Sequence, residues 1–368
     1  MPELGYATGG DAATAPTVPL DAAGEARARA LLAGPVASLH EHPVRLPEPL
    51  TADTWAAHMR GAVDVLAGDE LAASVLDLVV ATCFSQPDPA FVASWAASMS
   101  GQIAAQSGLR PVRTWTDLDG PGVGVALGLE DLGTVRTLGD LDELQRLGIV
   151  MAGVAYNHGS PLGCGLAQHD TGLTNFGHEA IARMNALGMV VDVSHAGDRT
   201  SLEAIEASTA PVAINHAGAQ SLWGSTRMVP DRVIRAAAER GGVIGIEAAP
   251  GSTRTDADAA GHTVHDVVRH IEYCAESFGV GAVALGGDTF YGDHVGLYRA
   301  LDSRGSEPPA GAVPFDLEPV AGADNPSELP VQVCRALITR GWADVDIAAV
   351  LGGNARRLLT AVLPERAA

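Results

Sequence analysis

The stretch "MVVDVSHAGD" (residues 189–198) is a short apolar run that ends in Ser194 and His195, followed by Ala-Gly. The stretch "PVAINHAGA" (residues 211–219) repeats this pattern and ends in His216, again followed by Ala-Gly. Short, nearly continuous apolar runs are typical of strands that are covered on both faces of a parallel sheet. The sequence therefore predicts two buried strands, each of which carries an imidazole at its C-terminal end.

Six further apolar runs of this kind occur along the chain. They span residues 35–40, 74–83, 123–129, 150–156, 242–249 and 281–288. Amphipathic segments separate them, such as residues 173–188, with Thr174 as a cap and Gly188 as a terminus, and a segment opened by a capping box at Thr200–Glu203. Eight strands that alternate with helices favour a single α/β domain, a (β/α)8 TIM barrel, over two doubly wound sheets.

The sequence contains no feature that would divide it into two domains. No G-x-G-x-x-G motif follows an early strand, and no Pro/Ser-rich linker interrupts the chain. We expect a flexible tail over residues 1–20 and one barrel domain over residues 21–368. A long loop at about 291–325, rich in Gly, Pro and acidic residues, follows the last predicted strand.

Composition restricts the class of partner. The formal net charge of -21 disfavours nucleic acids and anionic membranes, because binding to both depends on Lys and Arg. Residues 1–20 lack the pattern of a signal peptide, and no run reaches the roughly 18 apolar residues of a membrane span. We therefore expect a cytoplasmic protein with reduced thiols at its widely spaced cysteines, Cys83, Cys164, Cys274 and Cys334.

Polar side chains stand at the ends of most predicted strands. They are His40, Glu41, His42, Glu130, Asp131, Tyr156, Asn157, His158, His195, His216, Glu247 and Asp288. In a barrel these ends meet at one rim. One such histidine alone is more often a structural residue, but burying four histidines and two carboxylates without partners would be costly, and metal ions would pair with all of them. We predict as metal ligands His40, His42, Glu130, His195, His216 and Asp288.

The motif "HEH" at residues 40–42 has its own geometry. Residues i and i+2 of a strand point the same way, so His40 and His42 can hold one ion while Glu41 faces away. Imidazole and carboxylate ligands suit zinc, with manganese, cobalt and iron left open. Two ions roughly 3.5–4 Å apart can turn a bridging water into hydroxide near neutral pH and polarise a carbonyl group. We predict two Zn²⁺ per chain, bridged by Glu130.

Several segments resemble the membrane dipeptidase (renal dipeptidase-like, M19 peptidase) family of amidohydrolase-type barrels. They are "GLTNFGHEAIARMNALGMVVDVSHAGDRT", "PVAINHAGAQSL", "AERGGVIGIEAAPG", "HIEYCAESFGVGAVALGGDTFYG" and "GGNARRLL". The resemblance implies a two-zinc barrel that hydrolyses dipeptides, including some with a C-terminal D-residue, and by analogy a homodimer. It implies a bridging role for Glu130, the second zinc on His195 and His216, proton exchange at Asp288, and a substrate carboxylate held by Arg227.

Two positions depart from the pattern of that family. The first-strand motif is normally His-x-Asp, whereas this chain has His40 and His42, which makes the site one unit more positive. Tyr156 stands at the position where the family has a histidine that polarises the substrate. The hydroxyl of Tyr156, or the nearby His158, is a candidate to bind the substrate in its place. Glu247 is expected to contact a substrate amine or to pair with a loop arginine.

These departures leave two alternatives to a dipeptidase. One is an amidohydrolase of the same fold that acts on an N-acyl amino acid, a lactam or a lactone. The other is a non-catalytic barrel whose site has decayed. Of the remaining histidines, His58 and His178 lie in predicted helices. We expect five others to be solvated, and they are His169, His262, His265, His270 and His294. Of these, only His294 has a weak case for contact with a ligand.

Overall fold

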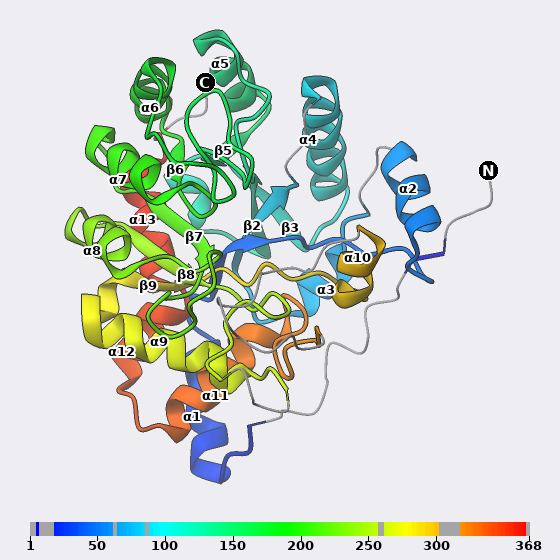
Figure 1. Cartoon of the computed structure of the whole chain (residues 1–368). Helices are drawn as coiled ribbons and strands as arrows, with labels where there is room; N and C mark the ends of the chain where they lie inside the picture. Colours follow the sequence, from blue (N-terminus) through cyan, green and yellow to red (C-terminus); the bar gives the residue numbers. More distant parts are fainter. Residues whose placement is uncertain are drawn as a thin grey trace.

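The computed structural model of the chain describes residues 5–6, 18–61, 65–84, 88–256, 261–301 and 317–365. Parallel strands alternate with helices along most of this length (Figure 1). The strands are β1 (Ala37–Glu41), β2 (Leu78–Cys83), β3 (Leu109–Val112), β4 (Val123–Leu129), β5 (Ile149–Gly153), β6 (Val190–Asp192), β7 (Ala213–Ala217), β8 (Val243–Ile246) and β9 (Val283–Leu285).

The helices mostly lie between consecutive strands and form the outer layer in Figure 1. They are α1 (Ala22–Leu32), α2 (Ala52–Gly61), α3 (Gly68–Ala73), α4 (Pro89–Ala104), α5 (Leu138–Arg146), α6 (Asn175–Leu187), α7 (Asp198–Ala207), α8 (Asp231–Glu239), α9 (Val264–Phe278), α10 (His294–Ala300), α11 (Glu328–Thr339), α12 (Asp344–Ala348) and α13 (Asn354–Val362). In the described part of the chain, no helix combines the length and the apolar character needed to cross a membrane.

Pairing between β2 and β4 closes the sheet. The strand order is β2-β1-β9-β8-β7-β6-β5-β4-β3, and residues 78–83 of β2 also pair in register with residues 124–129 of β4. Strand β3 pairs with the first half of β4 and stands outside the closed ring. The prediction of a (β/α)8 TIM barrel is therefore confirmed, and β3 is an addition that the sequence analysis missed.

Four predicted strands end three residues earlier than the sequence suggested. They are β5, β6, β8 and β9, which end at residues 153, 192, 246 and 285, although the apolar runs continue to residues 156, 195, 249 and 288. The last three residues of each run leave the ladder and enter the rim of the barrel. His195 and Asp288 therefore lie just beyond the ends of β6 and β9, and Asp288 N still donates to the carbonyl of His40.

Helix α13 fills the N-terminal end of the barrel. Its apolar residues Leu358 and Leu359 belong to one buried cluster with Leu39, Val80 and other side chains of the barrel interior. Asn354, at the start of α13, donates two 2.8 Å hydrogen bonds to the carbonyl oxygens of Val280 and Val283. Because this end is closed by packed side chains, the accessible chemistry belongs to the opposite rim.

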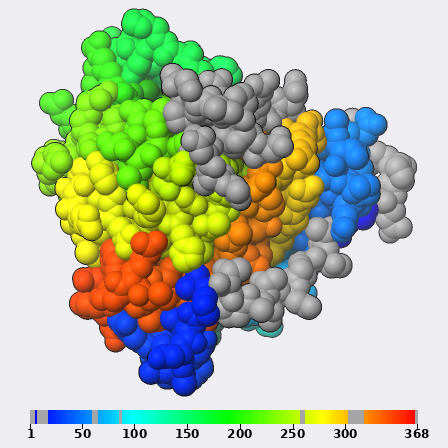
Figure 2. Space-filling view, turned by 60° about the horizontal axis from the view of Figure 1, so that its bottom comes forward, coloured from blue at the N-terminus to red at the C-terminus, as the bar shows by residue number. Residues whose placement is uncertain are grey.

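The first helix, α1, lies against α11. Figure 2 shows the blue surface of α1 against the orange-red surface of the C-terminal helices. Arg335 of α11 donates to both carboxylate oxygens of Glu25 in α1, at 2.9 and 2.7 Å, and to the carbonyl of Val18. These bonds join α1 and the residue Val18 before it to α11.

The start of α6 follows the sequence signal, but the start of α7 does not. Thr174 accepts a hydrogen bond from Gly177 N, and Gly188 ends α6 in the left-handed region at φ 68°. The predicted capping box at residues 200–203 is wrong, because α7 begins at Asp198 and Thr200 lies inside it. The distant carboxylate of Asp170 accepts from the backbone N–H groups of residues 199 and 200, which satisfies the helix start from another loop.

The predicted tail and the predicted long loop lie largely outside the described residues. Within the first 20 residues, Val18 is buried, and its N–H donates to Gln332. Within residues 291–325, helix α10 occupies positions 294–300, and residues 302–316 fall outside the description. The segment after β9 therefore returns as a helix to the rim.

Three strands approach each other closely through glycine. A Cβ atom on Gly286 would stand 1.8 Å from the carbonyl oxygen of Asn215, and one on Gly245 would stand 2.2 Å from the same atom. We expect Gly286→Ala to lower the free energy of unfolding by about 2 kcal/mol or more, because backbone atoms must move to admit the methyl group. Chemical denaturation measures this change.

Gly281→Ala is the matched control for Gly286→Ala. A Cβ atom at Gly281 meets nothing within 4 Å, so its unfolding free energy should stay close to that of the parent protein. Equal stability of the two variants would contradict the proposed close approach of the strands.

Candidate metal centre

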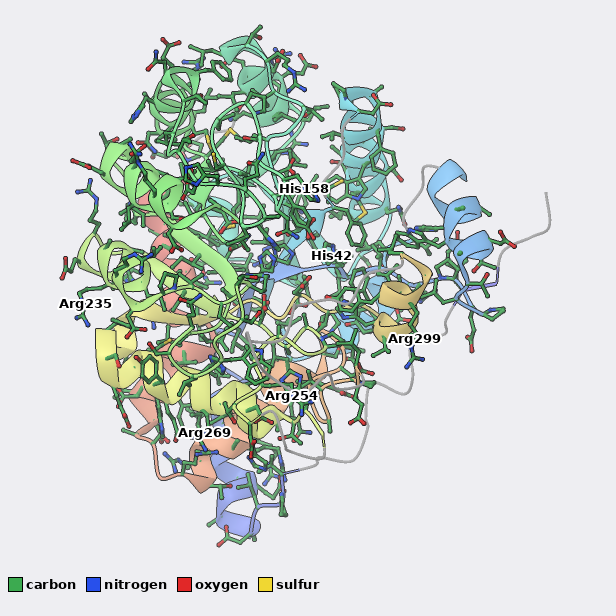
Figure 3. The ribbon with its side chains drawn as sticks, in the orientation of Figure 1. His42, His158, Arg235, Arg254, Arg269 and Arg299 are labelled. Carbon is green, nitrogen blue, oxygen red and sulfur yellow. The ribbon has the colours of Figure 1, made fainter. Side chains whose placement is uncertain are left out.

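The polar residues predicted at the strand ends meet at one rim of the barrel. His40 lies in β1, His42 follows it, and His216 lies in β7. Glu130 directly follows β4. Figure 3 shows His42 at the end of β1, in the middle of the ring of strands. The barrel closure therefore assembles side chains that are up to about 250 residues apart in the sequence.

The ligand atoms of four residues form a compact group. One ligand atom each of His40, Glu130, His216 and Asp288 lies within 4.8 Å of the other three. His42 joins this group, with its Nε2 3.2 Å from Asp288 Oδ1 and 3.6 Å from Glu130 Oε1. His195 joins it through its Nε2, which is 2.9 Å from His216 Nε2. The structure thus brings all six predicted metal ligands together.

Hydrogen bonds fix which nitrogen of three imidazoles faces the centre. His42 Nδ1 donates to the carbonyl of Thr82 at 2.9 Å. His195 Nδ1 donates to Asn157 Oδ1 at 3.0 Å, and His216 Nδ1 donates to Asn215 Oδ1 at 2.5 Å. Because these protons sit on Nδ1, the Nε2 lone pairs of the two neutral rings, His195 and His216, point toward each other at 2.9 Å, and His42 Nε2 faces the carboxylates. Such outer hydrogen bonds are typical of metal-binding histidines.

The protonation states of the imidazoles suit metal ligation. Burial lowers the pKa of His40 to about 3, and burial also holds the pKa values of His195 and His216 well below their ordinary value. Neutral imidazole is the form that binds a metal. Within the described residues, the buried Nδ1 atom of His40 has no hydrogen-bond partner. The arrangement of lone pairs around two carboxylates therefore fits a divalent cation.

His42 marks the point where the negative charge of the centre is concentrated. Burial lowers the pKa of this imidazole, but the hydrogen bonds that its Nε2–H donates to the carboxylates of Asp288 and Glu130 outweigh burial and raise the pKa to about 10. The His42 ring lies between the rings of Phe84 and Phe290, with centroid distances of 4.3 and 4.6 Å. The two aromatic faces fix the ring in a position that the sequence pattern alone did not reveal.

Glu41 braces the segment that carries Asp288. It is fully buried and accepts hydrogen bonds from Thr289 N and Oγ1 at 3.0 and 2.7 Å, from Gly287 N at 3.2 Å and from Ser38 Oγ at 2.7 Å. Asp288, between the two anchored residues, has a positive φ of 54°. A non-glycine residue in this region needs support from its surroundings. Glu41 supplies that support and makes these contacts away from the ligand atoms.

Among the predicted substrate contacts, Tyr156 lies at the centre and His158 does not. The Tyr156 ring is 4.3 Å from the His195 ring, and the negative charge of Glu130 raises the pKa of its hydroxyl. His158 is exposed, and within the described residues no hydrogen bond or ion pair joins it to the ligands. The structure thus places Tyr156, and not His158, beside the predicted metal ligands.

Arg227 pairs with Glu247 beside the ligands. Its Nη2 lies 2.5 Å from Glu247 Oε2 and donates to the carbonyl of His216 at 2.7 Å, while Nη1 donates to the carbonyl of Ser194 at 3.3 Å. Burial raises the pKa of Glu247 to about 7, and the charge of Arg227 opposes this rise. Of the two roles expected for Glu247, the structure shows the pairing with a loop arginine.

Three histidines expected in solvent are buried instead. His294 of α10 packs against Phe290, with a ring-centroid distance of 4.7 Å, and the prediction of its exposure is wrong. His270 accepts a hydrogen bond from Ala219 N at 2.9 Å, and His262 accepts one from Gly251 N at 3.3 Å. These bonds brace the loops after β7 and β8. His169 and His265 are exposed, as expected.

Tyr298 is a rim residue that sequence reasoning missed. It lies in α10, four residues after His294, and their rings are 4.7 Å apart. Burial, together with the negative charge of Asp288, raises the pKa of its hydroxyl well above the ordinary value. The spacing of four residues on a helix was the available signal, but the helix itself lies in a segment that the sequence predicts as a loop.

The geometry of the rim agrees with the family to which the sequence can be assigned. Residues 99–298, more than half of the chain, match the family model of the membrane dipeptidases, peptidase family M19. The chain belongs to the M19 family. The match includes Glu130, His195, His216 and Asp288, whereas His40 and His42 precede it.

Curated M19 relatives resemble part of this chain. Dipeptidase 3 of Rattus norvegicus is 29% identical over 192 residues, which cover 52% of this chain and 34% of that protein. Dipeptidase tcpJ of Claviceps purpurea is 29% identical over 191 residues, which cover 52% of this chain and 39% of that protein. The matched segment thus spans little more than a third of these curated relatives.

Solved structures agree in fold over nearly the whole chain. An amidohydrolase from Pseudomonas aeruginosa has a TM-score of 0.75 at 22% identity, with 91% of this chain and 99% of that chain covered. A metallo peptidase from Rhodobacter sphaeroides, liganded with a phosphinate mimic of the dipeptide L-Ala-D-Ala, has a TM-score of 0.67 at 16% identity. The match covers 89% of this chain and 99% of the metallo peptidase chain. At these identities the likeness supports the barrel fold.

Metal binding should stabilise this M19 chain. We expect saturating Zn²⁺ to raise the Tm of the chelator-treated protein by roughly 5 °C, because a ligand at 100 times its Kd stabilises by about 2.7 kcal/mol. His216→Ala should lose most of this shift, since it removes one ligand of the compact group. The exposed His265→Ala is the control and should retain it. Equal shifts in both variants would contradict the proposed centre.

The outer hydrogen bond to His195 should contribute to metal affinity. We expect Asn157→Ala to raise the Kd for Zn²⁺ about 10- to 100-fold, because the imidazole loses the acceptor that orients it. Titration with a competing chelator measures this Kd. Asn185→Ala, which removes bonds to Ser208 and Thr209 at the end of α6, serves as control. An unchanged Kd for Zn²⁺ in Asn157→Ala would contradict the proposal that Asn157 orients His195.

Proposed function

We propose that this protein is a metal-dependent dipeptidase that hydrolyses the amide bond of dipeptides and of closely related small molecules, with two Zn²⁺ per chain. The observation that carries the proposal is the group of six ligands at the C-terminal rim, four imidazoles and two carboxylates, on a chain of the M19 family. A decayed, non-catalytic barrel would not be expected to keep the outer hydrogen bonds of His42, His195 and His216.

The residues divide between two ion positions. His40, His42 and Asp288 would hold one ion and His195 and His216 the other, and Glu130, which lies in one compact group with His40, His216 and Asp288, would serve both. Imidazole nitrogen and carboxylate oxygen form a donor set that zinc accepts. Bound divalent ions supply a Lewis acid for the substrate carbonyl and lower the pKa of a bound water.

Asp288 is the residue that we propose to move the proton. Burial raises the pKa of its carboxyl group, but the hydrogen bond from His42 and the charge of His40 outweigh burial and hold the pKa below its ordinary value. The carboxylate form can accept a proton from the attacking water and return it to the amine nitrogen as the C–N bond breaks. Water adds to the carbonyl carbon, and a carboxylate and an amine result.

Tyr156 is proposed to bind the substrate next to the second ion position. Its ring lies against His195, and its hydroxyl remains protonated at neutral pH because its pKa is raised. A neutral phenol donates a hydrogen bond to a carbonyl oxygen without adding charge. It thus offers a donor where the resemblance to the family leads one to expect a histidine.

The experiment that tests this function is a panel of small substrates at pH 8. It contains L-Ala-L-Ala, L-Ala-D-Ala and the C-terminal amides of both, and the released amine is quantified with and without Zn²⁺. We include the D-residue because a related metallo peptidase was solved with a mimic of L-Ala-D-Ala. We expect metal-dependent cleavage of the bond between the two alanines in at least one member.

Asp288→Asn should reduce kcat on the best substrate by at least 100-fold, because the amide cannot accept the proton, a loss in the range typical of general acid–base groups. Asp346 in α12, which is partly exposed, provides the control Asp346→Asn, which should keep the parent kcat. Absence of cleavage on the whole panel, with metal bound, would reject the proposed function.

A further inference from the structure

Aromatic rings line one side of the metal centre. Aromatic residues make up only 4% of the chain, yet contacts between ring centroids run without a break from His42 to α10. Phe290 lies 4.6 Å from His42 and 4.7 Å from His294, whose ring lies 4.7 Å from that of Tyr298. Phe84 stacks on His42 at 4.3 Å. We call four of these residues the aromatic strip: Phe84, Phe290, His294 and Tyr298.

Three segments of the chain build the aromatic strip. Phe84 directly follows β2, and Phe290 lies just beyond β9, so both stand at the C-terminal rim. Helix α10 carries His294 and Tyr298 about one helical turn apart. Figure 3 shows α10 on the side of the barrel where His42 lies. The strip therefore borders the ion position that we assign to the ligands of β1.

Tyr298 is the member of the strip on α10 that a bound molecule could touch. Phe290 and His294 are buried, whereas Tyr298 is partly exposed. Burial and the negative charge of Asp288 raise the pKa of the Tyr298 hydroxyl, in agreement with a position toward the metal ligands. No hydrogen bond joins this hydroxyl to another of the described residues. Both the ring and the hydroxyl are therefore available to a ligand.

The strip is the apolar half of the rim. Its members follow β2 and β9, the two strands that flank β1. Asn157 and Arg227 lie beyond β5 and β7, which flank β6 on the opposite side of the ring. Burial lowers the pKa of His294 to about 4, so its ring is neutral at neutral pH. A molecule at the centre thus meets aromatic rings on one side and polar groups on the other.

We propose that the aromatic strip, through Tyr298, selects substrates with an aromatic or large apolar side chain on the residue whose carbonyl group is attacked. The inference rests on the proposed function, because it names the substrate class of the same site. Burying such a side chain against aromatic rings removes apolar surface from water. This contact is apolar, so it does not depend on the charge of the two Zn²⁺ ions.

The position of that side chain follows from covalent geometry. The side chain of the acyl residue is attached to the carbon bonded to the attacked carbonyl group, so it stays close to the ions. The strip packs on His42, beside one ion position. The leaving residue of a dipeptide carries a carboxylate, and the side chains of the strip include no cation to pair with it. The acyl residue is therefore the one that lies against Tyr298.

The test compares L-Phe-L-Ala, L-Ala-L-Phe and L-Ala-L-Ala in the zinc-loaded protein. We expect kcat/KM to be at least about tenfold higher for L-Phe-L-Ala than for L-Ala-L-Ala, as is typical of added apolar groups in a pocket, and no comparable gain for L-Ala-L-Phe. Tyr298→Ala should remove most of the preference for L-Phe-L-Ala. Tyr298→Phe keeps the ring and should retain the preference.

Tyr273→Ala is the matched control. The Tyr273 ring packs against Phe278 in α9, and its hydroxyl donates to Asp231, so its removal should leave the preference unchanged. Equal kcat/KM for L-Phe-L-Ala and L-Ala-L-Ala, an equal gain with L-Ala-L-Phe, or a preference that Tyr298→Ala does not reduce would overturn the inference. The metal content and Tm of each variant are measured first, so that a misfolded variant is recognised.

A binding measurement separates this inference from the proposed function. Hydroxamates of L-phenylalanine and L-alanine chelate divalent ions and leave no peptide bond to cleave, so their calorimetric titration requires no turnover. We expect the phenylalanine compound to bind at least about tenfold more tightly to the parent protein, but not to Tyr298→Ala. If no dipeptide is cleaved and this difference is found, the proposed function fails and the selection stands. If dipeptides are cleaved and the two hydroxamates bind equally, or if neither binds, the selection fails.

Discussion

The structure of the rim depends on four buried imidazoles that face two carboxylates. Hydrogen bonds to Asn157 and Asn215 place protons on the outward nitrogens of His195 and His216, so the inward nitrogens of these two rings carry lone pairs. Lone pairs 2.9 Å from each other repel unless a cation lies between them. The closed barrel, the support of Asp288 by Glu41, and the stacking of His42 on two phenylalanines all hold this arrangement in place.

Much of the fold and of the candidate site could be predicted from the sequence, because the C-terminal ends of the parallel strands of a barrel meet at one rim. Once the apolar runs are assigned to a barrel, the residue after each run is placed at the same rim, and His40, Glu130 and His216 become neighbours without any knowledge of contacts. The same argument placed His195 and Asp288 there, although both strands end three residues earlier than their apolar runs. The proximity of the six predicted ligands could therefore be derived from pattern and spacing.

What escaped prediction depends on contacts between distant segments. The carboxylate that caps α7 comes from Asp170, so the local capping-box motif at residues 200–203 gave a wrong start. The burial of His262 and His270 follows from loops folding over them, and β3 contains a proline that weakens its strand signal. Tyr298 reaches the rim only because a helix forms where composition suggests a loop. Each of these features needs a partner that lies far away in the chain.

The closure of the barrel base by α13 has a consequence for how the protein is made. Strand β1 pairs with β9, and the interior between them is covered by side chains of residues 355–363. A nascent chain emerges from its N-terminus at roughly 5–20 residues per second. One edge of β1 pairs with β2, but its other edge stays unpaired until β9, nearly 250 residues away, has been synthesised, and the interior stays open to water until α13 has formed. Apolar strands such as β2 and β4 are exposed during this interval, which makes synthesis, more than the finished fold, the stage most vulnerable to aggregation.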